Sequence, residues 1–335
     1  MKLSIILPVY NVAAFIGRAL DSIYSQGMKE DDFEVICVDD CSPDNSYEVI
    51  SGYLYEGHHP ENLIILRHSV NKRQGGARNT GIRAARGKWI LTLDADDFYL
   101  PDTLKKLLEA AEADPRLDTV MFDIYIGDGT FDNAKFNYCP RNLDTRTMTG
   151  VEFLQKMPGI CQLWKYLYRR DHLLATGFTI EENTRLEDVD FVLRYTAHSK
   201  AIRFLPLVVY YWVQHPNQTT YYKGDNPKLI IEYIFLAYRI YRVAIEEKSH
   251  SPIASKVIME RARQMFRVRL TRAMWRLSFR DILATLRKYR LEPTGDHLFD
   301  FVNRHTLFTA IVLTALKPFF NIALRVVRVK RRIKK

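Results

Sequence analysis

The chain contains little cysteine, and we expect its N-terminal residues to form a strand and not a signal peptide. Its 335 residues include 4 cysteines, and no two of them form a CxxC pair. Such a small, irregularly spaced set excludes a disulfide framework, and the missing CxxC pair removes the usual signature of a zinc site. The first residues hold one Lys and a short apolar run that ends at Pro8, which is too short for a signal peptide. We therefore expect a cytoplasmic chain with reduced, buried thiols at Cys37, Cys41, Cys139 and Cys161.

Excess positive charge is missing from most of the chain and concentrated at its end. Residues 251–335 contain 20 Lys and Arg against 5 Asp and Glu, whereas residues 1–250 contain 29 against 34. The overall charge of +10 therefore arises from the last quarter. With 47% hydrophobic and 26% charged residues, the composition is typical of a globular protein and excludes a disordered or collagen-like chain. The length indicates about two domains.

Apolar runs of strand length alternate with helical patterns in the first third of the chain. Strands are expected over 3–9, 33–38, 62–66 and 89–93, and helices over 12–26, 45–56, 76–85 and 101–113. Asn11 is the expected N-cap of the first helix, and Pro101 the expected first-turn residue of the fourth. Because each strand is almost continuously hydrophobic, the alternation predicts an α/β fold, a doubly wound and mainly parallel sheet with helices on both faces.

The pattern changes toward the C-terminus. Less regular elements follow residue 118, with strands expected at 119–125 and 202–213 and helices at 150–157 and 186–198. After Pro227 long helical patterns dominate, at 228–248, 252–277, 279–290 and 297–329. We therefore place a boundary near residue 225, which separates a domain at 1–225 from a basic helical region at 226–335.

Polar turns directly follow three of the predicted strands. They are Tyr10-Asn11, Asp39-Asp40 and Asp94-Ala95-Asp96-Asp97. Ligands of parallel sheets bind beyond the carboxyl ends of the strands, so these turns should converge on one edge. Crowded carboxylates repel one another, and a bound cation relieves that repulsion. Oxygen ligands of this kind favour Mg²⁺ or Mn²⁺. The alternative is an acidic surface turn that caps the following helix.

Two further segments indicate a functional site only when they are considered together with these turns. The segment from Gly75 to Gly81 opens a helix, where glycines allow close backbone approach and Arg78 can form a fork to phosphate or a base edge. It is neither GxGxxG nor a Walker loop, so a plain loop-to-helix turn stays open. Glu187-Asp188 begins an amphipathic helix, and the pair is either a cap that complements the helix dipole or a general base.

Together, five ordered motifs resemble the family 2 inverting glycosyltransferases of the GT-A fold. They are Leu7-Pro8-Val9-Tyr10-Asn11, Val38-Asp39-Asp40-Cys41-Ser42, Gly76-Ala77-Arg78-Asn79-Thr80-Gly81, Leu93-Asp94-Ala95-Asp96-Asp97 and Leu186-Glu187-Asp188-Val189-Asp190-Phe191. Order and spacing match over about residues 1–220. The resemblance implies a metal-dependent enzyme of surface-polysaccharide synthesis. It would transfer a sugar from a nucleotide donor, expected to be UDP-linked, to a hydroxyl of a glycan or lipid-linked acceptor.

The resemblance also implies roles for single residues. Asp188 matches the catalytic base, and Glu187 its partner in the same motif. Asp96 and Asp94 match the site of the Mn²⁺ or Mg²⁺ ion that bridges the diphosphate, and Asp94 would also meet the ribose. Asp40 is favoured for the uracil edge. The other positions expected around the nucleotide are Pro8, Tyr10, Asn11, Asp39, Arg78, Asn79 and Ala95.

Two segments near the expected site allow alternative interpretations. Where the family often has an Arg-containing segment resembling YYxRQRPGS, this chain has Tyr210-Tyr211-Trp212-Val213-Gln214-His215-Pro216. His215 either replaces a basic phosphate contact or has no ligand role. Trp164 either forms a wall for an acceptor sugar or belongs to the core.

The basic C-terminal region also allows several interpretations. Residues 261–290 hold ten Lys and Arg against one acidic residue, and the apolar stretch 306–324 is interrupted by Lys317-Pro318. A clean membrane span needs about 20 apolar residues. We favour an interfacial amphipathic anchor on anionic lipid, at the inner face of the cell membrane. A true span and a soluble helical bundle stay open, and no nucleic-acid recognition motif accompanies the charge.

Two other functions remain open at this point. A sugar-nucleotide nucleotidyltransferase would keep the sheet and change the chemistry, but the chain has no Gly-rich phosphate loop near its N-terminus. A non-catalytic protein that binds nucleotide sugars or nucleic acid would have affinity for UDP or polynucleotide without metal-dependent hydrolysis of a donor.

Overall fold

The computed structural model describes residues 1–53, 61–137, 144–156, 162–216, 227–288, 297–306, 309–312 and 314–315. The chain forms two compact units, Met1–Tyr221 and Tyr222–Lys335. Two of the four expected thiols, Cys139 and Cys161, lie outside the described residues.

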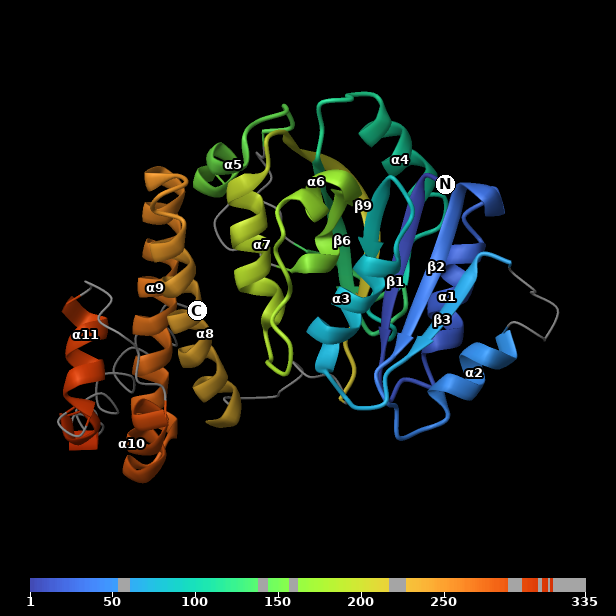
Figure 1. Cartoon of the computed structure of the whole chain (residues 1–335). Helices are drawn as coiled ribbons and strands as arrows, with labels where there is room; N and C mark the ends of the chain where they lie inside the picture. The colour runs from blue at the N-terminus through green and yellow to red at the C-terminus, as the bar shows by residue number, and fades with distance from the viewer. Residues whose placement is uncertain are drawn as a thin grey trace. The chain divides into compact units, whose positions relative to one another are not determined.

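The first unit is built on a nine-stranded sheet with the order β3-β2-β1-β4-β8-β6-β9-β5, and β7 pairs with β6 (Figure 1). The strands are β1 (Leu3–Val9), β2 (Phe33–Asp39), β3 (Leu63–Arg67), β4 (Trp89–Thr92), β5 (Phe98–Tyr99), β6 (Thr119–Gly127), β7 (Lys135–Asn137), β8 (Tyr166–Arg169) and β9 (Ile202–Val213). The long pairings β1–β2, β2–β3, β1–β4 and β6–β9 are parallel. The predicted fold class is confirmed, although the short strands β5, β7 and β8 pair antiparallel and were not predicted.

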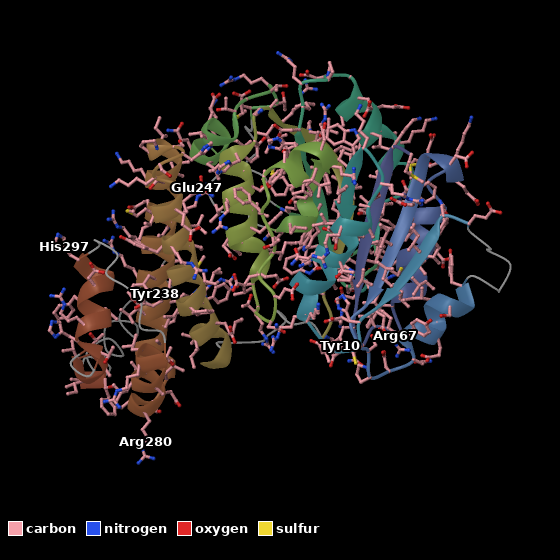
Figure 2. All side chains as sticks on the ribbon, in the orientation of Figure 1. Tyr10, Arg67, Tyr238, Glu247, Arg280 and His297 are labelled. Atoms are coloured by element: carbon pink, nitrogen blue, oxygen red, sulfur yellow. The ribbon has the colours of Figure 1, made fainter. Side chains whose placement is uncertain are left out.

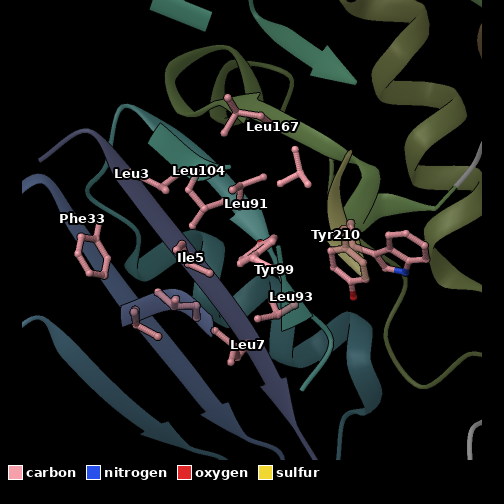
Figure 3. Close-up of a cluster of buried hydrophobic side chains, with 14 of the residues drawn as sticks. Leu3, Ile5, Leu7, Phe33, Leu91, Leu93, Tyr99, Leu104, Leu167 and Tyr210 are labelled. Atoms are coloured by element: carbon pink, nitrogen blue, oxygen red, sulfur yellow. The ribbon is translucent and has the colours of Figure 1, made fainter. Parts of the chain in front are cut away.

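Helices cover both faces of this sheet. They are α1 (Ile16–Tyr24), α2 (Ser46–Tyr53), α3 (Arg73–Ala84), α4 (Leu104–Glu112), α5 (Gly150–Lys156), α6 (Arg170–Ala175) and α7 (Glu187–His198). Successive residues of β1 face opposite sides, so Leu3, Ile5 and Leu7 pack with α1 and α4 (Figure 3), whereas Ile6 packs with α3 and α7. Because both faces are covered, β1 and β2 are buried along their whole lengths, which explains their continuous hydrophobic runs.

Several predicted helix boundaries and the predicted burial of one thiol are wrong. Asn11 has a left-handed φ of 56° and caps no helix, and α1 begins later, at Ile16. Pro101 does not start α4, which begins at Leu104. The left-handed residue Asp102 (φ 56°) separates the two. Cys37 is buried in β2 as expected, but Cys41 is exposed because it lies in the turn beyond the strand.

The second unit is helical, as predicted. Its helices are α8 (Pro227–Glu246), α9 (Pro252–Arg276), α10 (Phe279–Lys288) and α11 (His297–Arg304). The Ser251 hydroxyl accepts the Ala254 N–H at 3.2 Å, and Pro252 takes the first helical position, so α9 begins where the sequence indicates. The helix expected over 297–329 is interrupted at His305, because α11 ends at Arg304; residues 306, 309–312 and 314–315 are helical again, and residues 316–335 lie outside the described set. Among the described residues, no helix combines the length and apolarity needed to cross a membrane.

Candidate active site

The first two predicted polar turns meet at the carboxyl edge of the parallel strands. In the register of the sheet Val9 pairs with Asp39, and Asp39 pairs with Arg67. The Asp40 N–H donates to the Val9 carbonyl at 2.8 Å. Tyr10 is 48% exposed at this edge, and Figure 2 shows it at the same end of the sheet as Arg67. The convergence predicted from connectivity is therefore confirmed for these turns.

The Asp39 carboxylate is fully buried and held in place by its neighbours. Its Oδ2 lies 3.0 Å from Arg67 Nε, and its Oδ1 accepts the Ser42 N–H at 3.2 Å. The Arg67 guanidinium lies over the Tyr47 ring, 4.4 Å from the ring centroid. This arrangement fixes both the charge and the aromatic surface at the end of β2 and β3.

The neighbouring Asp40 keeps one oxygen available. Its Oδ1 accepts the Lys72 N–H at 2.8 Å and lies 2.7 Å from Nδ1 of His68. The other imidazole nitrogen lies 2.9 Å from the Thr80 hydroxyl, so the ring is fixed on both sides. Asp40 Oδ2 is buried and makes no hydrogen bond within the described part of the chain. Buried acceptors normally have a partner, so this oxygen is suited to a ligand donor.

The acidic turn after β4 is anchored to the neighbouring strands. The Leu93 N–H donates to the Ile6 carbonyl at 2.9 Å, which places the turn beside the end of β1. Asp97 is buried and accepts from the Tyr210 hydroxyl at 2.6 Å and from the Val213 N–H at 2.8 Å. Burial, together with the nearby Asp96 and Asp94 carboxylates, raises the pKa of Asp97 well above its ordinary value.

Asp96 lies against an aromatic and imidazole pair. His215 Nε2 is 2.9 Å from Asp96 Oδ2, and the imidazole stacks on Phe15 with 4.5 Å between ring centroids. The Arg18 guanidinium donates to the Asp96 carbonyl at 3.3 Å. Burial and the nearby Asp94 carboxylate raise the pKa of Asp96, while His215 acts in the opposite direction. The structure therefore places His215 beside Asp96 in the site.

The start of α7 joins this acidic turn through Arg78. The guanidinium donates from Nη2 to Asp94 Oδ1 at 2.6 Å and from Nη1 to Glu187 Oε1 at 2.5 Å. Leu186, with a left-handed φ of 57°, turns the chain into the helix. Partial burial and the carboxylates of Glu187 and Asp94 raise the pKa of Asp188 to about 7, and Arg78 limits the rise. The motifs at the ends of β4 and the start of α7 therefore share one site.

Other predicted site residues contact protein. Both polar atoms of the Asn79 amide bond the Ile180 backbone, at 2.8 and 2.9 Å. A Cβ at Gly75 would lie 2.2 Å from the Glu181 carbonyl oxygen, so this glycine allows close approach of protein backbone, where the sequence suggested a ligand. Trp164 stacks on Tyr210 within the core, which favours the core alternative. Pro8 is buried in β1, Asn11 is exposed beyond it and Ala95 is buried in the acidic turn.

Sequence reasoning missed several neighbours of these motif residues. Arg67 is the last residue of β3 and His68 follows it, and they contact Asp39 and Asp40. The rest of β3 is apolar, so the strand gave no sign of a functional site. Phe15 and Tyr210 looked like ordinary apolar positions of a helix and a strand. The position of a polar pair directly after a third parallel strand could have identified Arg67-His68.

Comparisons with known proteins identify the family of the chain. A family model described as Glycosyl transferase family 2 matches residues 4–173. The uncharacterized glycosyltransferase EpsJ of Bacillus subtilis (strain 168) is 32% identical over 225 residues, which cover 65% of this chain and 62% of EpsJ. A poly(ribitol-phosphate) beta-glucosyltransferase of Bacillus spizizenii is 41% identical over 105 residues, 31% of this chain and 16% of that protein. The matches thus span less than two thirds of these relatives.

Solved structures give the same result for the fold. The S. aureus TarS 1-349 structure superposes with a TM-score of 0.66 at 20% identity, covering 85% of this chain and 79% of that one. Its complex with UDP-GlcNAc gives a TM-score of 0.63 at 19% identity, with 93% and 88% covered. At such identities the likeness shows the fold, which is GT-A. The family match covers half of the residues, and the chain belongs to glycosyl transferase family 2.

Proposed function

We propose that the chain is an inverting glycosyltransferase that moves a sugar from a UDP-linked donor to a hydroxyl of a glycan or lipid-linked acceptor in surface-polysaccharide synthesis. The observation that carries the proposal is the joining of Asp94, after β4, to Glu187 and Asp188, on α7, through Arg78. This arrangement supports the proposal of a general base on α7 close to a donor site at the end of β4. The TarS structure in complex with UDP-GlcNAc supports the choice of donor class.

The nucleotide would lie over the ends of β1 and β2. The exposed Tyr10 ring offers a surface for the base, and the unpaired Asp40 Oδ2 offers an acceptor for the uracil N–H. Asp39, which Arg67 holds in place, would form one wall of the same pocket. Asp94, with one oxygen on Arg78, would meet the ribose.

A divalent cation fits the acidic turn. Burial and the nearby Asp94 carboxylate raise the pKa of Asp96, and His215 Nε2 lies 2.9 Å from Asp96 Oδ2. Carboxylate oxygens of this kind suit Mn²⁺ or Mg²⁺. Asp96, with Asp94 or His215, would hold the ion, which when bound offsets negative charge on the diphosphate leaving group. The PcManGT mannosyltransferase of Pyrobaculum calidifontis, described in complex with GDP-Man and Mn²⁺, has the same fold (TM-score 0.54, 17% identity).

Asp188 would act as the general base. Its carboxylate takes the proton of the acceptor hydroxyl, and the hydroxyl oxygen bonds to the anomeric carbon as the bond to the nucleotide diphosphate breaks on the opposite face. The configuration at that carbon inverts in this single displacement. A pKa of about 7 suits a base that works near neutral pH.

We also propose that the second unit associates peripherally with anionic lipid at the inner face of the membrane. Arg267, Arg280 and Arg287 are exposed on α9 and α10, and Val268 and Ile311 are exposed apolar side chains. Cations of this kind are attracted to anionic headgroups, and apolar side chains insert among them. A soluble bundle would show no preference for anionic over neutral vesicles.

The experiment for the enzymatic proposal is a screen of nucleotide sugars with and without Mn²⁺. We expect release of the nucleoside diphosphate from one donor, dependent on the metal, and transfer once an acceptor is supplied. Release of pyrophosphate from a sugar phosphate and a nucleoside triphosphate would instead indicate a nucleotidyltransferase. Nucleotide affinity with no turnover of any donor would indicate a binding protein.

A further inference from the structure

We propose that Arg78 is a positioning residue for the catalytic base and does not bind the nucleotide. Its guanidinium is the bridge that fixes the start of α7 against the acidic turn after β4. This inference rests on the proposed function of Asp188. It replaces the nucleotide contact that the sequence suggested for Arg78.

The bridge uses the two ends of the guanidinium on residues far apart in sequence. Nη1 bonds Glu187, at the first position of α7, and Nη2 bonds Asp94, just beyond β4, at 2.5 and 2.6 Å. The Arg78 side chain is 3% exposed and that of Glu187 is 5% exposed. Planar guanidinium groups make such double contacts with fixed geometry, which an ammonium group cannot reproduce.

Little of the guanidinium is accessible to a ligand, because the Arg78 side chain is only 3% exposed. Two of its five N–H donors bond the carboxylates of Asp94 and Glu187, and Nε is buried without a hydrogen bond within the described residues. A nucleotide that bound Arg78 would have to reach a side chain that the protein covers, beside two charge-assisted hydrogen bonds. Breaking a buried ion pair is costly because it leaves a carboxylate without its partner.

The helix that carries Arg78 is itself fixed to the segment that leads to α7. The neighbouring Asn79 bonds both the N–H and the carbonyl of Ile180. Gly75 packs so closely on Glu181 that a side chain would not fit. Arg78 and Glu187 are thus held at a set distance by backbone contacts as well as by their own ion pair.

Asp188 is the group that this bridge affects. The charged and titratable groups around it come from four elements: Glu187 on α7, Arg78 on α3, Asp94 after β4 and Tyr168 on β8. Glu187 and Asp94 favour the protonated carboxyl, and Arg78 favours the carboxylate. Neutralising Arg78 should therefore raise the pKa of Asp188, and neutralising Glu187 should lower it.

The test compares Arg78→Lys, Arg78→Gln and Glu187→Gln with Arg83→Gln, a control at an exposed position on the same helix. We expect Arg78→Lys to lower kcat about a hundredfold, a size typical of a misplaced catalytic group. The affinity for UDP in Mn²⁺, measured by calorimetry, should fall much less, and only through the loosened Asp94. The pH at which kcat rises should increase in Arg78→Gln and decrease in Glu187→Gln. Arg83→Gln should match the wild type in all three measurements.

A loss of UDP affinity in Arg78→Lys with an unchanged kcat would overturn the inference, because it would identify a nucleotide ligand. Unaltered pH profiles in both charge variants would overturn it as well. Should Arg78→Gln fail to fold, the downward shift in Glu187→Gln decides the question. Should the wild type transfer no sugar, the proposed function fails. The inference is then tested by the carboxyl infrared band of Asp188, assigned with Asp188→Asn, which should titrate at higher pH in Arg78→Gln.

Discussion

The two units of this chain differ in how far their charged side chains are buried. At the carboxyl edge of the sheet, Asp39, Asp40 and Arg78 are buried and bonded to specific partners. On α9 and α10, Arg267, Arg280 and Arg287 are exposed. The first unit belongs to the part of the chain with a small negative net charge, and the second contains the excess of cations. The comparison teaches that a high density of exposed charge indicates a surface that attracts partners of opposite charge. Buried charges that are paired with specific neighbours instead indicate a candidate site for chemistry.

The largest effect is expected from Asp188→Asn, which tests the chemical side of this comparison. Loss of a general base lowers kcat by about 10²–10⁴-fold, because the amide cannot accept the acceptor proton. UDP affinity should stay unchanged, as measured by calorimetry with Mn²⁺ present. Asp132→Asn, in an exposed loop, is the matched control and should retain full activity. Normal turnover in Asp188→Asn would remove this residue from the mechanism.

The exposed cations of the second unit should account for a smaller but substantial effect on lipid binding. Each Arg near an anionic surface contributes about 1 kcal/mol, so replacing Arg267, Arg280 and Arg287 with Gln should weaken vesicle binding about a hundredfold. Co-sedimentation with phosphatidylserine-containing and neutral vesicles measures the change. Transfer of sugar to a soluble acceptor should be unaffected. Equal binding to both kinds of vesicle would contradict the membrane proposal.

The acidic turn should bind UDP only with its cation. Asp96→Ala removes a proposed ligand, and we expect the affinity for UDP in Mn²⁺ to fall by at least about tenfold, in the range seen when metal sites are disturbed. Wild-type protein treated with EDTA should show the same weak affinity, and the variant should not respond to EDTA. A variant that binds UDP as the wild type does would contradict the metal role of Asp96.

The pH dependence of kcat should follow Asp188. A base must be ionised to accept a proton, so with a pKa of about 7 the rate should rise with pH through this value. Below it, kcat should fall about tenfold for each pH unit. Rates measured between mild acid and mild alkali at saturating donor test this slope. A rate that is constant across neutral pH would place the base elsewhere.

The smallest effect concerns the anchoring of the acidic turn. Tyr210→Phe removes the hydroxyl that donates to buried Asp97 and accepts the Asp94 N–H at 3.2 Å. A buried group left without its partner costs about 1–3 kcal/mol in the free energy of unfolding. Urea denaturation measures this loss, and Tyr47→Phe, at a half-buried ring, serves as the control. Equal stability of Tyr210→Phe and wild type would show that the hydroxyl does not anchor the turn.

The sequence predicted those parts of the fold that depend on long local patterns. The strand expected over 202–213 is β9, and the polar ends of β1 and β2 meet as connectivity requires. Strands of two to four residues such as β5 and β8 carry too few positions for a pattern and form through pairing with distant strands. Left-handed turns at Asn11 and Cys41 likewise arise from the surrounding structure.

The site was predictable as a set of motifs but not as a set of contacts. Arg78 and Glu187 are separated by 109 residues, and only the packing of α3 against the segment before α7 brings them together. The contact of His215 with Asp96 spans 119 residues. No local pattern encodes such pairings, so residues that hold other residues in place were missed or taken for ligands.

The central claim is a single displacement at the anomeric carbon with Asp188 as the base. The most direct test is to determine the anomeric configuration of the first-formed product by proton NMR, using the donor identified in the nucleotide-sugar screen. The account predicts a configuration opposite to that of the donor sugar. A product with the donor's own configuration would contradict it, because retention requires a second displacement or a different mechanism.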